Sequence, residues 1–409
     1  MKLSKILAFL ILAMSLSGIF LSSCKSGGED NTTGNSYYLS SETKVNLSVS
    51  DIKANLNELI PNFSTFFGSI ISSDVQVQKV VYKTTFQNKT IEASGLACFP
   101  KTPGNYPILS FQNGTNTVYK DAPTENPSED NILMLESLAS TGFIVVIPDY
   151  IGFGVSTSLP HPYLDAKSST QSILDMIRAT KELATDDKIV AKPTKDLFIF
   201  GYSQGGWATL QLQRTIEKEY SSEFNLIASS CGAGPYSIEY MTDYVLAKDV
   251  YPMPYFLAYV LNSYINIGSI TNPLSDFFQA TYAAKIPGLF DGLHTGGEIN
   301  AALTTQIPSL LTTDFRTSYT TVSKFAAFKS VINSNSVKAW SLSTPTKLFH
   351  GASDDYIPPG ISSKMYSDFM TADSNNSTKL ELRTVPGDHS TAVSMVAFQT
   401  LSWFLQIKK

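Results

Sequence analysis

Several residue types are scarce in this sequence, and each scarcity excludes a class of protein. The 409 residues include only three cysteines and four histidines, and these are not spaced as a zinc-binding cluster would be. Charged residues make up 16% of the chain and the formal net charge is −5, so we expect no broad basic surface and no nucleic-acid partner. We find no internal repeat, and the 43% of apolar residues exclude a disordered chain. What remains is a globular protein with a large core.

The N-terminus has the pattern of a targeting segment. Lys2 and Lys5 supply positive charge, and residues 6–21 supply an apolar core. That core is shorter than the roughly 20 residues that a membrane-spanning helix needs. The segment is therefore expected to direct export rather than to cross the membrane.

The next four residues indicate a lipoprotein. LSSC, residues 21–24, resembles the lipobox that bacterial lipoprotein signal peptidase cuts. The resemblance implies a signal peptide over 1–23, lipid on Cys24, and anchoring to the outer or cytoplasmic membrane. An ordinary secretory signal followed by a chance cysteine is the alternative. Residues 24–44, polar and glycine-rich at their start, are predicted to be a flexible tether.

Two further cysteines remain if Cys24 carries lipid. Cys98 and Cys231 each end an apolar, strand-like run. They could pair in an exported protein. We expect two buried thiols instead, because their strands are not predicted to be neighbours.

Strand-like and helix-like segments alternate along the chain. Strand patterns cover 75–86, 91–99, 106–112, 142–150, 196–203, 224–234, 344–351 and 379–387. Helical patterns cover 51–60, 131–141, 168–184, 205–220, 359–372 and 390–406. Uninterrupted apolar runs such as 142–150 are typical of strands buried on both faces. The alternation predicts an α/β fold with a mostly parallel sheet flanked by helices.

This alternation stops over residues 235–340. The segment is rich in Tyr, Met and Pro, its pattern indicates irregular helices, and about 100 inserted residues are too many for a loop in a compact domain. We predict a helical cap here, inserted between a first core part, 45–234, and a second, 341–409. A second independent domain is the alternative, and it would need a complete core of its own.

The residues Gly201-Tyr202-Ser203-Gln204-Gly205 carry the strongest sign of chemistry. The pattern G-x-S-x-G lies between a predicted strand and a predicted helix, which is the context of a nucleophilic serine on a tight turn. The turn strains the serine backbone, and bulky flanking residues would clash. The following helix points its positive N-terminal end at Ser203.

A nucleophilic serine needs a base that an acid orients. With this turn, the acid and the histidine follow the serine in that order along the chain. The four histidines are His161, His294, His350 and His389. His161 precedes the serine, His294 lies in the predicted cap, and His350 is still in a strand-to-loop transition. His389 is therefore the predicted base, with a satisfied surface histidine as the alternative.

The acid is expected in the loop 350–359, which directly follows a strand. Asp354 and Asp355 compete there, and the spacing in HG-x-x-D-x-x-I-P favours Asp354. Asp388 adjoins His389 and cannot reach behind its ring.

An oxyanion needs two backbone N–H donors. One is the amide of Gln204, which follows the serine. The other is expected from QNGTNT after the strand 106–112, where Gly114 or Thr115 is the candidate. A plain Asn-Gly turn is the alternative interpretation of that loop.

Four motifs together resemble the α/β-hydrolase superfamily, and within it the secretory lipase family. They are GYSQGG, PDYIGFG, QNGT and the late pair HG-x-x-D-x-x-I-P with GDHS. The resemblance covers roughly residues 75–409, and the cap matches in position and size more than in motif. The family often has His-Gly-Thr where this chain has Asn113-Gly114-Thr115, although a backbone donor tolerates that change.

The resemblance implies hydrolysis of carboxylic esters through an acyl-enzyme, with no cofactor or metal. A small-molecule or lipid-like ester is the implied partner, and the cap covers the acyl pocket. Its many tyrosines suit a hydrophobic group, although packing against the core explains most of them. The alternatives are an acetyl or feruloyl esterase acting on polysaccharide, a peptidase of the same fold, and a non-catalytic binding lipoprotein.

Overall fold

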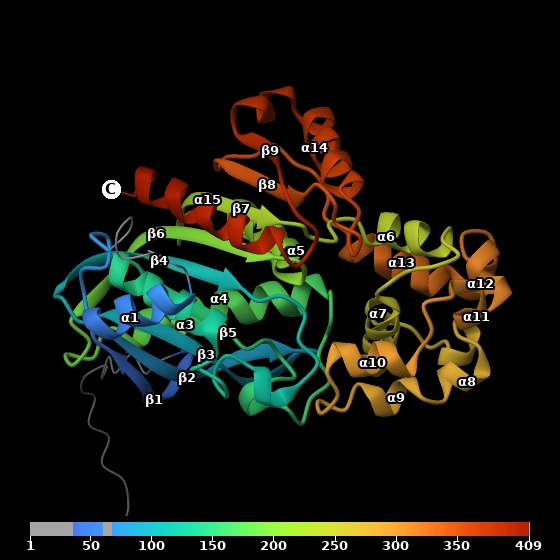
Figure 1. Ribbon diagram of the computed structural model, residues 1–409, viewed down its shortest axis with the longest axis horizontal. Coiled ribbons are helices and arrows are strands. Elements are labelled where there is room, and N and C mark those ends of the chain that lie inside the picture. Colours follow the sequence, from blue (N-terminus) through green and yellow to red (C-terminus); the bar gives the residue numbers. More distant parts are fainter. Residues whose placement is uncertain (1–35, 60–67, 409) are drawn as a thin grey trace, which may run out of the picture. The chain divides into compact units, whose positions relative to one another are not determined.

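The computed structural model describes residues 36–59 and 68–408 (Figure 1). The predicted signal peptide 1–23 and Cys24 lie outside the described residues. Among the helices of the described part, none combines the length and the apolar character that crossing a membrane requires.

Nine strands of the described residues form one sheet in the order β1-β2-β3-β5-β4-β6-β7-β8-β9. They are β1 Tyr38–Leu47, β2 Val75–Phe86, β3 Lys89–Pro100, β4 Gly104–Gln112, β5 Ile144–Pro148, β6 Ala191–Tyr202, β7 Asn225–Gly232, β8 Thr346–Gly351 and β9 Leu380–Val385. The strands from β5 to β9 in this order pair in parallel, whereas β1, β2, β3 and β5 pair antiparallel. The prediction of a mostly parallel α/β sheet is confirmed.

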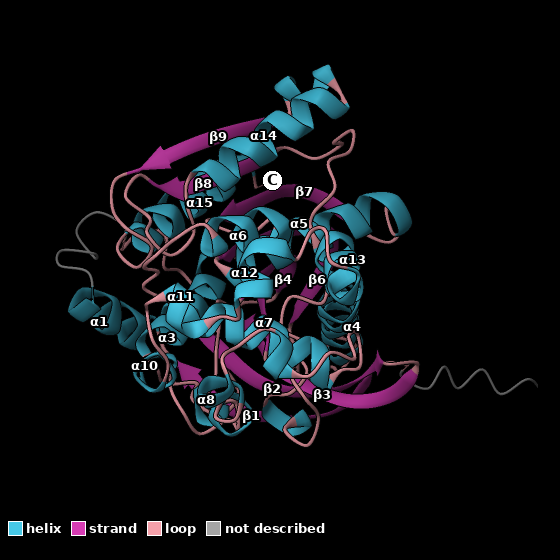
Figure 2. Ribbon diagram, turned by 90° about the vertical axis from the view of Figure 1, so that its right-hand side faces the viewer, coloured by secondary structure: helices cyan, strands magenta, loops and turns pink. Residues whose placement is uncertain are grey.

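Helices pack on both faces of this sheet (Figures 1 and 2). They are α1 Val49–Leu59, α3 Asp130–Ser137, α4 Ala166–Leu183, α5 Gln204–Glu219, α14 Gly360–Ala372 and α15 Ala392–Ile407. Buried residues of α4, α5 and α14 belong to one hydrophobic cluster, and those of α1, α3 and α15 belong to a second.

Strand β6 shows how the sequence produces the two clusters. Leu197 and Ile199 belong to the first cluster, and Phe198 and Phe200 to the second. Successive side chains of a strand point to opposite faces, so an uninterrupted apolar run serves both layers. The C-terminal end of this strand, held from both sides, carries Ser203.

The two described cysteines are separate. Cys98 on β3 and Cys231 on β7 are free and buried, and they lie in opposite clusters. The expectation of two buried thiols is confirmed, because three strands stand between β3 and β7.

The segment between β7 and β8 is helical. It contains α6 Ile238–Leu246, α7 Pro254–Asn266, α8 Ala280–Ala283, α9 Ile286–Leu289, α10 Gly296–Ala302, α11 Ile307–Leu310, α12 Thr313–Ser318 and α13 Ala326–Asn335. Its buried side chains, such as Tyr264 and Phe315, join the same cluster as α4 and α5. This continuity disfavours the alternative of an independent domain with a separate core.

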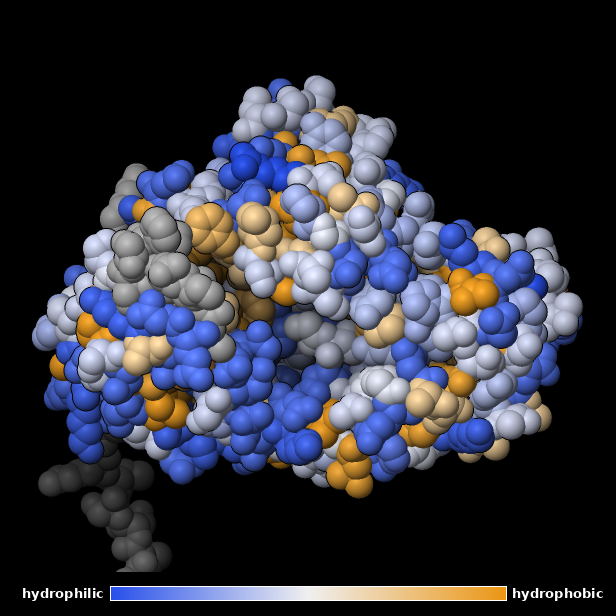
Figure 3. All heavy atoms as spheres, in the orientation of Figure 1, coloured by the Kyte–Doolittle hydropathy of each residue, from blue (hydrophilic) through white to orange (hydrophobic). Residues whose placement is uncertain are grey.

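On the face drawn in Figure 3, apolar residues are scattered among hydrophilic ones.

One boundary of the predicted tether is wrong. Residues 38–44, assigned to the tether, belong to β1 and pair with β2. The Glu182 carboxylate of α4 accepts hydrogen bonds from the backbone N–H groups of Ser36, Tyr37 and Tyr38, at 3.0, 2.9 and 2.7 Å. A strand whose side chains are mostly polar and exposed lacks the apolar alternation by which strands are predicted. The contact with Glu182 cannot be predicted from neighbouring residues either, because Glu182 is far away in the sequence.

Candidate active site

Ser203 occupies a strained turn between β6 and α5. Its φ is 58° and its ψ is −123°, a conformation that L-residues other than glycine rarely adopt. The flanking glycines are needed sterically: a Cβ on Gly205 would lie 1.9 Å from the carbonyl oxygen of Gln112, and one on Gly201 would lie 2.3 Å from that of Gly205. The predicted strain and the predicted steric role of both glycines are confirmed.

The side chains of Ser203, His389 and Asp354 form a continuous chain of hydrogen bonds. Ser203 Oγ lies 2.9 Å from His389 Nε2, and His389 Nδ1 lies 2.7 Å from Asp354 Oδ2. An ionised carboxylate only accepts, so Nδ1 carries the proton and Nε2 turns its lone pair to the serine hydroxyl. All three residues are buried, with exposed fractions of 8%, 7% and 5%.

Asp354 is surrounded by donors. Its Oδ1 accepts from the backbone N–H groups of Tyr356 and Ile357, at 3.0 and 2.8 Å. Its Oδ2 also lies 3.3 Å from His350 Nε2. Burial alone would raise the pKa of this carboxyl, but the hydrogen bonds from His350, His389 and the backbone outweigh burial and lower the pKa to about 2. The group is therefore ionised at neutral pH.

The competing acids lie elsewhere. Asp355 is exposed. Asp388 Oδ1 accepts hydrogen bonds from the N–H groups of Ser390 and Thr391, so it shapes its own turn. Of the acidic residues considered from the sequence, Asp354 is the one in contact with His389.

Two tyrosines that sequence reasoning did not assign to the site hold His389. The hydroxyl of Tyr202 donates to the carbonyl oxygen of His389 at 2.7 Å. The ring of Tyr356 lies 5.1 Å from the imidazole, centroid to centroid. Tyr202 is a variable position of the G-x-S-x-G pattern, so its sequence position gave no signal of this contact.

The loop after β4 lies against the first turn of α5. The Cβ that Gly205 lacks would fall 2.8 Å from the carbonyl oxygen of Asn113 as well. Asn113 Nδ2 donates to Pro148 O at 2.7 Å, and the Tyr150 hydroxyl donates to Asn113 O at 3.1 Å. These hydrogen bonds hold the loop at the end of β5, next to the turn that contains Ser203. Gly114 and Thr115 stay candidates for the second oxyanion donor.

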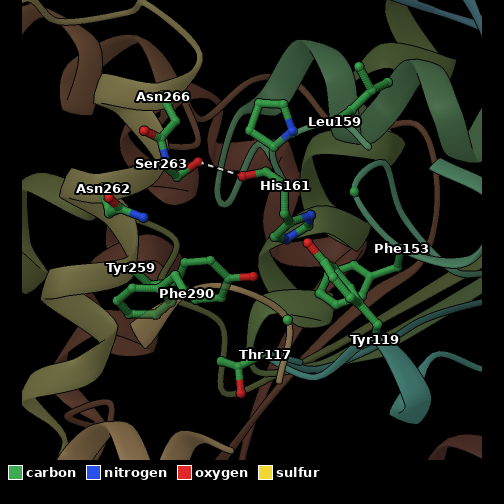
Figure 4. A pocket seen from close by; sticks show the side chains of 13 residues that line it. Thr117, Tyr119, Phe153, Leu159, His161, Tyr259, Asn262, Ser263, Asn266 and Phe290 are labelled. Carbon is green, nitrogen blue, oxygen red and sulfur yellow. Dashed lines mark hydrogen bonds between the residues drawn. The ribbon is translucent and has the colours of Figure 1, made fainter. Parts of the chain in front are cut away.

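A cavity of about 60 Å³ lies between α7 and the loops after β4 and β5 (Figure 4). Tyr259 and Asn262 of α7 face His161 and Phe153 across it. Asn262 is 3% exposed, and its Oδ1 has no hydrogen-bond partner among the described residues. His161, set aside from the sequence because it precedes the serine, also contacts Gln204, with 3.2 Å between His161 Nε2 and Gln204 Nε2.

The fold is similar to that of several solved structures. A Legionella pneumophila protein is 24% identical, with 91% of this chain and 98% of that chain covered and a TM-score of 0.80. The rice cell wall degrading esterase LipA from Xanthomonas oryzae is 23% identical, with 91% and 97% covered and a TM-score of 0.74. Candida antarctica lipase A in its closed state is 16% identical, with 92% and 82% covered and a TM-score of 0.66. These likenesses establish the α/β-hydrolase fold.

The sequence itself identifies the family. No curated protein shows a significant sequence match to the chain. The model of the secretory lipase family, by contrast, matches residues 122–406, which is well over half of the chain. The protein belongs to the secretory lipase family of exported ester hydrolases.

Proposed function

We propose that the protein cleaves carboxylic esters through an acyl-enzyme, with Ser203 as nucleophile, His389 as general base and Asp354 as the acid that orients it. The observation that carries the proposal is the pair of hydrogen bonds at 2.9 and 2.7 Å that joins the three side chains. The strained turn supports it further, because such strain persists at functional sites when the surrounding structure holds it.

The reaction follows from this arrangement. Ser203 Oγ attacks the ester carbonyl carbon while His389 Nε2 takes the hydroxyl proton, and the carbonyl oxygen becomes an oxyanion. Collapse of this intermediate breaks the bond to the alcohol, which leaves with the proton from Nε2. Water then attacks the acyl-enzyme with the same proton transfers and releases the carboxylic acid. Asp354 stays ionised throughout and stabilises the imidazolium.

The oxyanion is proposed to accept hydrogen bonds from the backbone N–H of Gln204 and from that of Gly114 or Thr115. The N–H groups of the first turn of a helix have no intrahelical acceptor, so the amide of Gln204 is available. The position of α5 also directs the positive end of its dipole at the developing charge.

The first choice of substrate is an acyl ester of the lipase or carboxylesterase type, with residues 235–340 as a cap over the site. Tyr251, which precedes α7, supports this role, because its hydroxyl donates to the carbonyl oxygen of Tyr356 at 2.8 Å beside His389. A polysaccharide esterase is the second candidate. The cavity beside His161 favours it, since a hydroxyl group of such a substrate could reach the unpaired Asn262 Oδ1 there, although about 60 Å³ does not hold a whole sugar or feruloyl ring.

Replacing Ser203 or His389 by Ala is expected to lower kcat for ester hydrolysis by about 10⁴-fold or more, because the nucleophile or its base is gone. Both variants should also fail to react with a fluorophosphonate probe, which needs an activated serine. The measurement is hydrolysis of p-nitrophenyl butyrate together with in-gel labelling. His294→Ala, a change of a partly exposed histidine in the segment between β7 and β8, is the control. Labelling that survives Ser203→Ala would refute the assignment.

Asp354→Asn is expected to lower kcat by roughly 10⁴-fold by imposing the wrong tautomer on His389. The N–H groups of Tyr356 and Ile357 keep the amide oxygen at the Oδ1 position. The amide NH₂ then faces His389 Nδ1 and donates to it, which moves the ring proton to Nε2. Steady-state kinetics of this variant and of Asp355→Asn, matched in chemistry and adjacent in sequence, provide the test. Equal losses in both variants would contradict the role of Asp354.

Substrate choice is expected to show in the acyl-chain dependence of kcat/KM. For a lipase-like enzyme with an apolar cap, kcat/KM should rise from p-nitrophenyl acetate through butyrate to octanoate, since each buried CH₂ contributes about 0.8 kcal/mol. Ser203→Ala serves as the blank. Activity confined to acetate or methyl ferulate would favour the polysaccharide esterase, and turnover of an aminoacyl p-nitroanilide alone would indicate a peptidase.

We also propose lipid anchoring at Cys24, on the strength of the LSSC motif and of a family whose members are exported. In a bacterial host the full chain should sediment with membranes and release into detergent. Cys24→Ala should prevent both lipid attachment and the cut before residue 24, so this variant should keep residues 1–23 and carry no lipid, as the intact mass would show. A wild-type protein that carries no lipid and is found in the soluble exported fraction would argue for an ordinary secretory signal.

A further inference from the structure

His161 touches the residue next to the nucleophile, although it belongs to the loop between β5 and α4. Its Nδ1 lies 2.7 Å from the carbonyl oxygen of Ile151, and its Nε2 lies 3.2 Å from Nε2 of Gln204. Gln204 is itself 2% exposed. The contact therefore links the loop after β5 to the first residue of α5 through a single imidazole.

The partners determine which nitrogen of His161 carries the proton. A backbone carbonyl only accepts, so Nδ1 donates to Ile151. In the neutral ring Nε2 is then an acceptor, and the Gln204 amide must turn its NH₂ toward it. Burial lowers the pKa of His161 to about 4, although the bond to Ile151 opposes that shift, so the neutral form is the one present at neutral pH.

Aromatic rings fix the plane of this imidazole. Phe153, Tyr259, Tyr163 and Tyr150 lie 5.0, 5.7, 6.0 and 6.1 Å from it, centroid to centroid. The remaining accessible surface of His161 lines the cavity beside α7 (Figure 4). These rings and the hydrogen bond to the Ile151 carbonyl hold the imidazole of His161 in one orientation. Its Nε2 therefore points in a fixed direction as an acceptor.

The start of α5 needs such an anchor. Helices usually begin with a side chain that accepts from the first free N–H groups. Here the N-cap residue is Ser203, which makes no side-chain cap hydrogen bond because its hydroxyl faces His389. The first turn of α5 is therefore without a side-chain cap, and its first residue, Gln204, contacts His161 through its side chain.

The other end of the Gln204 amide is unsatisfied. Gln204 Oε1 is buried and has no hydrogen-bond partner among the described residues. Buried amides in native proteins are normally paired at both ends, and an exception calls for an explanation. The contact with His161 pairs only the NH₂ group of Gln204 and leaves Oε1 unpaired. Its role is therefore better explained as holding Gln204 in place beside Ser203 than as satisfying the hydrogen bonds of the amide.

We propose that His161 is a positioning residue for ester hydrolysis: it holds the Gln204 side chain so that the backbone N–H of Gln204 keeps the direction needed to bind the oxyanion. The inference rests on the proposed role of that N–H. Because the oxyanion exists only in the transition state and the tetrahedral intermediate, losing the contact lowers kcat and leaves substrate binding unchanged.

The test compares His161→Phe, Gln204→Met and the double variant. His161→Phe keeps a ring among the neighbouring aromatic rings and removes both hydrogen bonds, and Gln204→Met keeps side-chain length and removes the amide. Each single variant is expected to lower kcat by about 10- to 100-fold with KM within about twofold, since one oxyanion donor is worth about 10²- to 10³-fold. The double variant should be no worse than the worse single variant, because both changes break one contact.

Two variants serve as rescue and control. His161→Gln places an amide oxygen where Nε2 was, so it can accept from Gln204 and should recover at least part of the lost kcat. Gln213→Met is the matched control: Gln213 is also a buried glutamine of α5 whose Oε1 has no partner among the described residues, and its NH₂ donates to Thr346 and Glu217 instead. This control should retain the wild-type kcat even if its thermal midpoint falls.

Affinity for a boronic acid transition-state analogue should fall in His161→Phe by the same factor as kcat/KM. If His161→Phe does not fold, Gln204→Met and His161→Gln still measure the contact. An unchanged kcat in Gln204→Met, a loss confined to KM, or losses that multiply in the double variant would each overturn the inference. Fluorophosphonate labelling separates the two hypotheses: a wild type that does not label refutes the proposed function, whereas a labelled His161→Phe with wild-type kcat refutes only the role of His161.

Discussion

The site depends on the contact between the first turn of α5 and the end of β4, where no side chain fits. A Cβ on Gly205 would lie 1.9 Å from the carbonyl oxygen of Gln112, so the helix can pack this closely against the end of the strand only with glycine at this position. This packing holds Ser203 at φ 58° against its own backbone preference. It also brings the loop that begins at Asn113 next to the serine. The proposed nucleophile, the N-terminus of α5 and the candidate oxyanion loop are therefore placed by one steric constraint.

The charges of the site depend on a second constraint, the burial of Asp354 among donors. Burial alone would neutralise a carboxyl, but its hydrogen bonds, those from His350 and His389 foremost, more than offset burial and keep the group ionised. The imidazole of His389 lies 5.1 and 5.2 Å, centroid to centroid, from the rings of Tyr356 and Tyr202, and the Tyr202 hydroxyl donates to the carbonyl oxygen of His389. These contacts position the imidazole, while the ionised Asp354 keeps the proton on Nδ1 and leaves Nε2 as an acceptor that faces Ser203.

Local sequence patterns predicted most strands and the candidate site residues. They did not predict contacts between residues that are far apart in the sequence. The apolar runs identified the strands, because strands buried on both faces need no alternation. The glycine spacing around Ser203 and the position of His389 after the last strand pointed to residues that the fold brings together. The contacts of His161, His350 and Glu182 were not predicted. Each of these side chains contacts either a residue far away in the sequence or backbone groups, and neither kind of partner leaves a pattern in the sequence. Strand β1, Tyr38–Leu47, was missed as a whole because a strand with mostly exposed side chains at the edge of the sheet has no apolar face.

The helical segment between β7 and β8 is tied to the site by buried hydrogen bonds as well as by shared core. Tyr251 donates to the carbonyl oxygen of Tyr356, and Trp207 of α5 donates from Nε1 to the carbonyl oxygen of Asn335 at 2.9 Å. Moving the whole segment as a rigid body would leave these buried groups unpaired, which costs about 1–3 kcal/mol for each. Local shifts that keep these hydrogen bonds therefore cost less free energy than lifting the whole segment from the sheet.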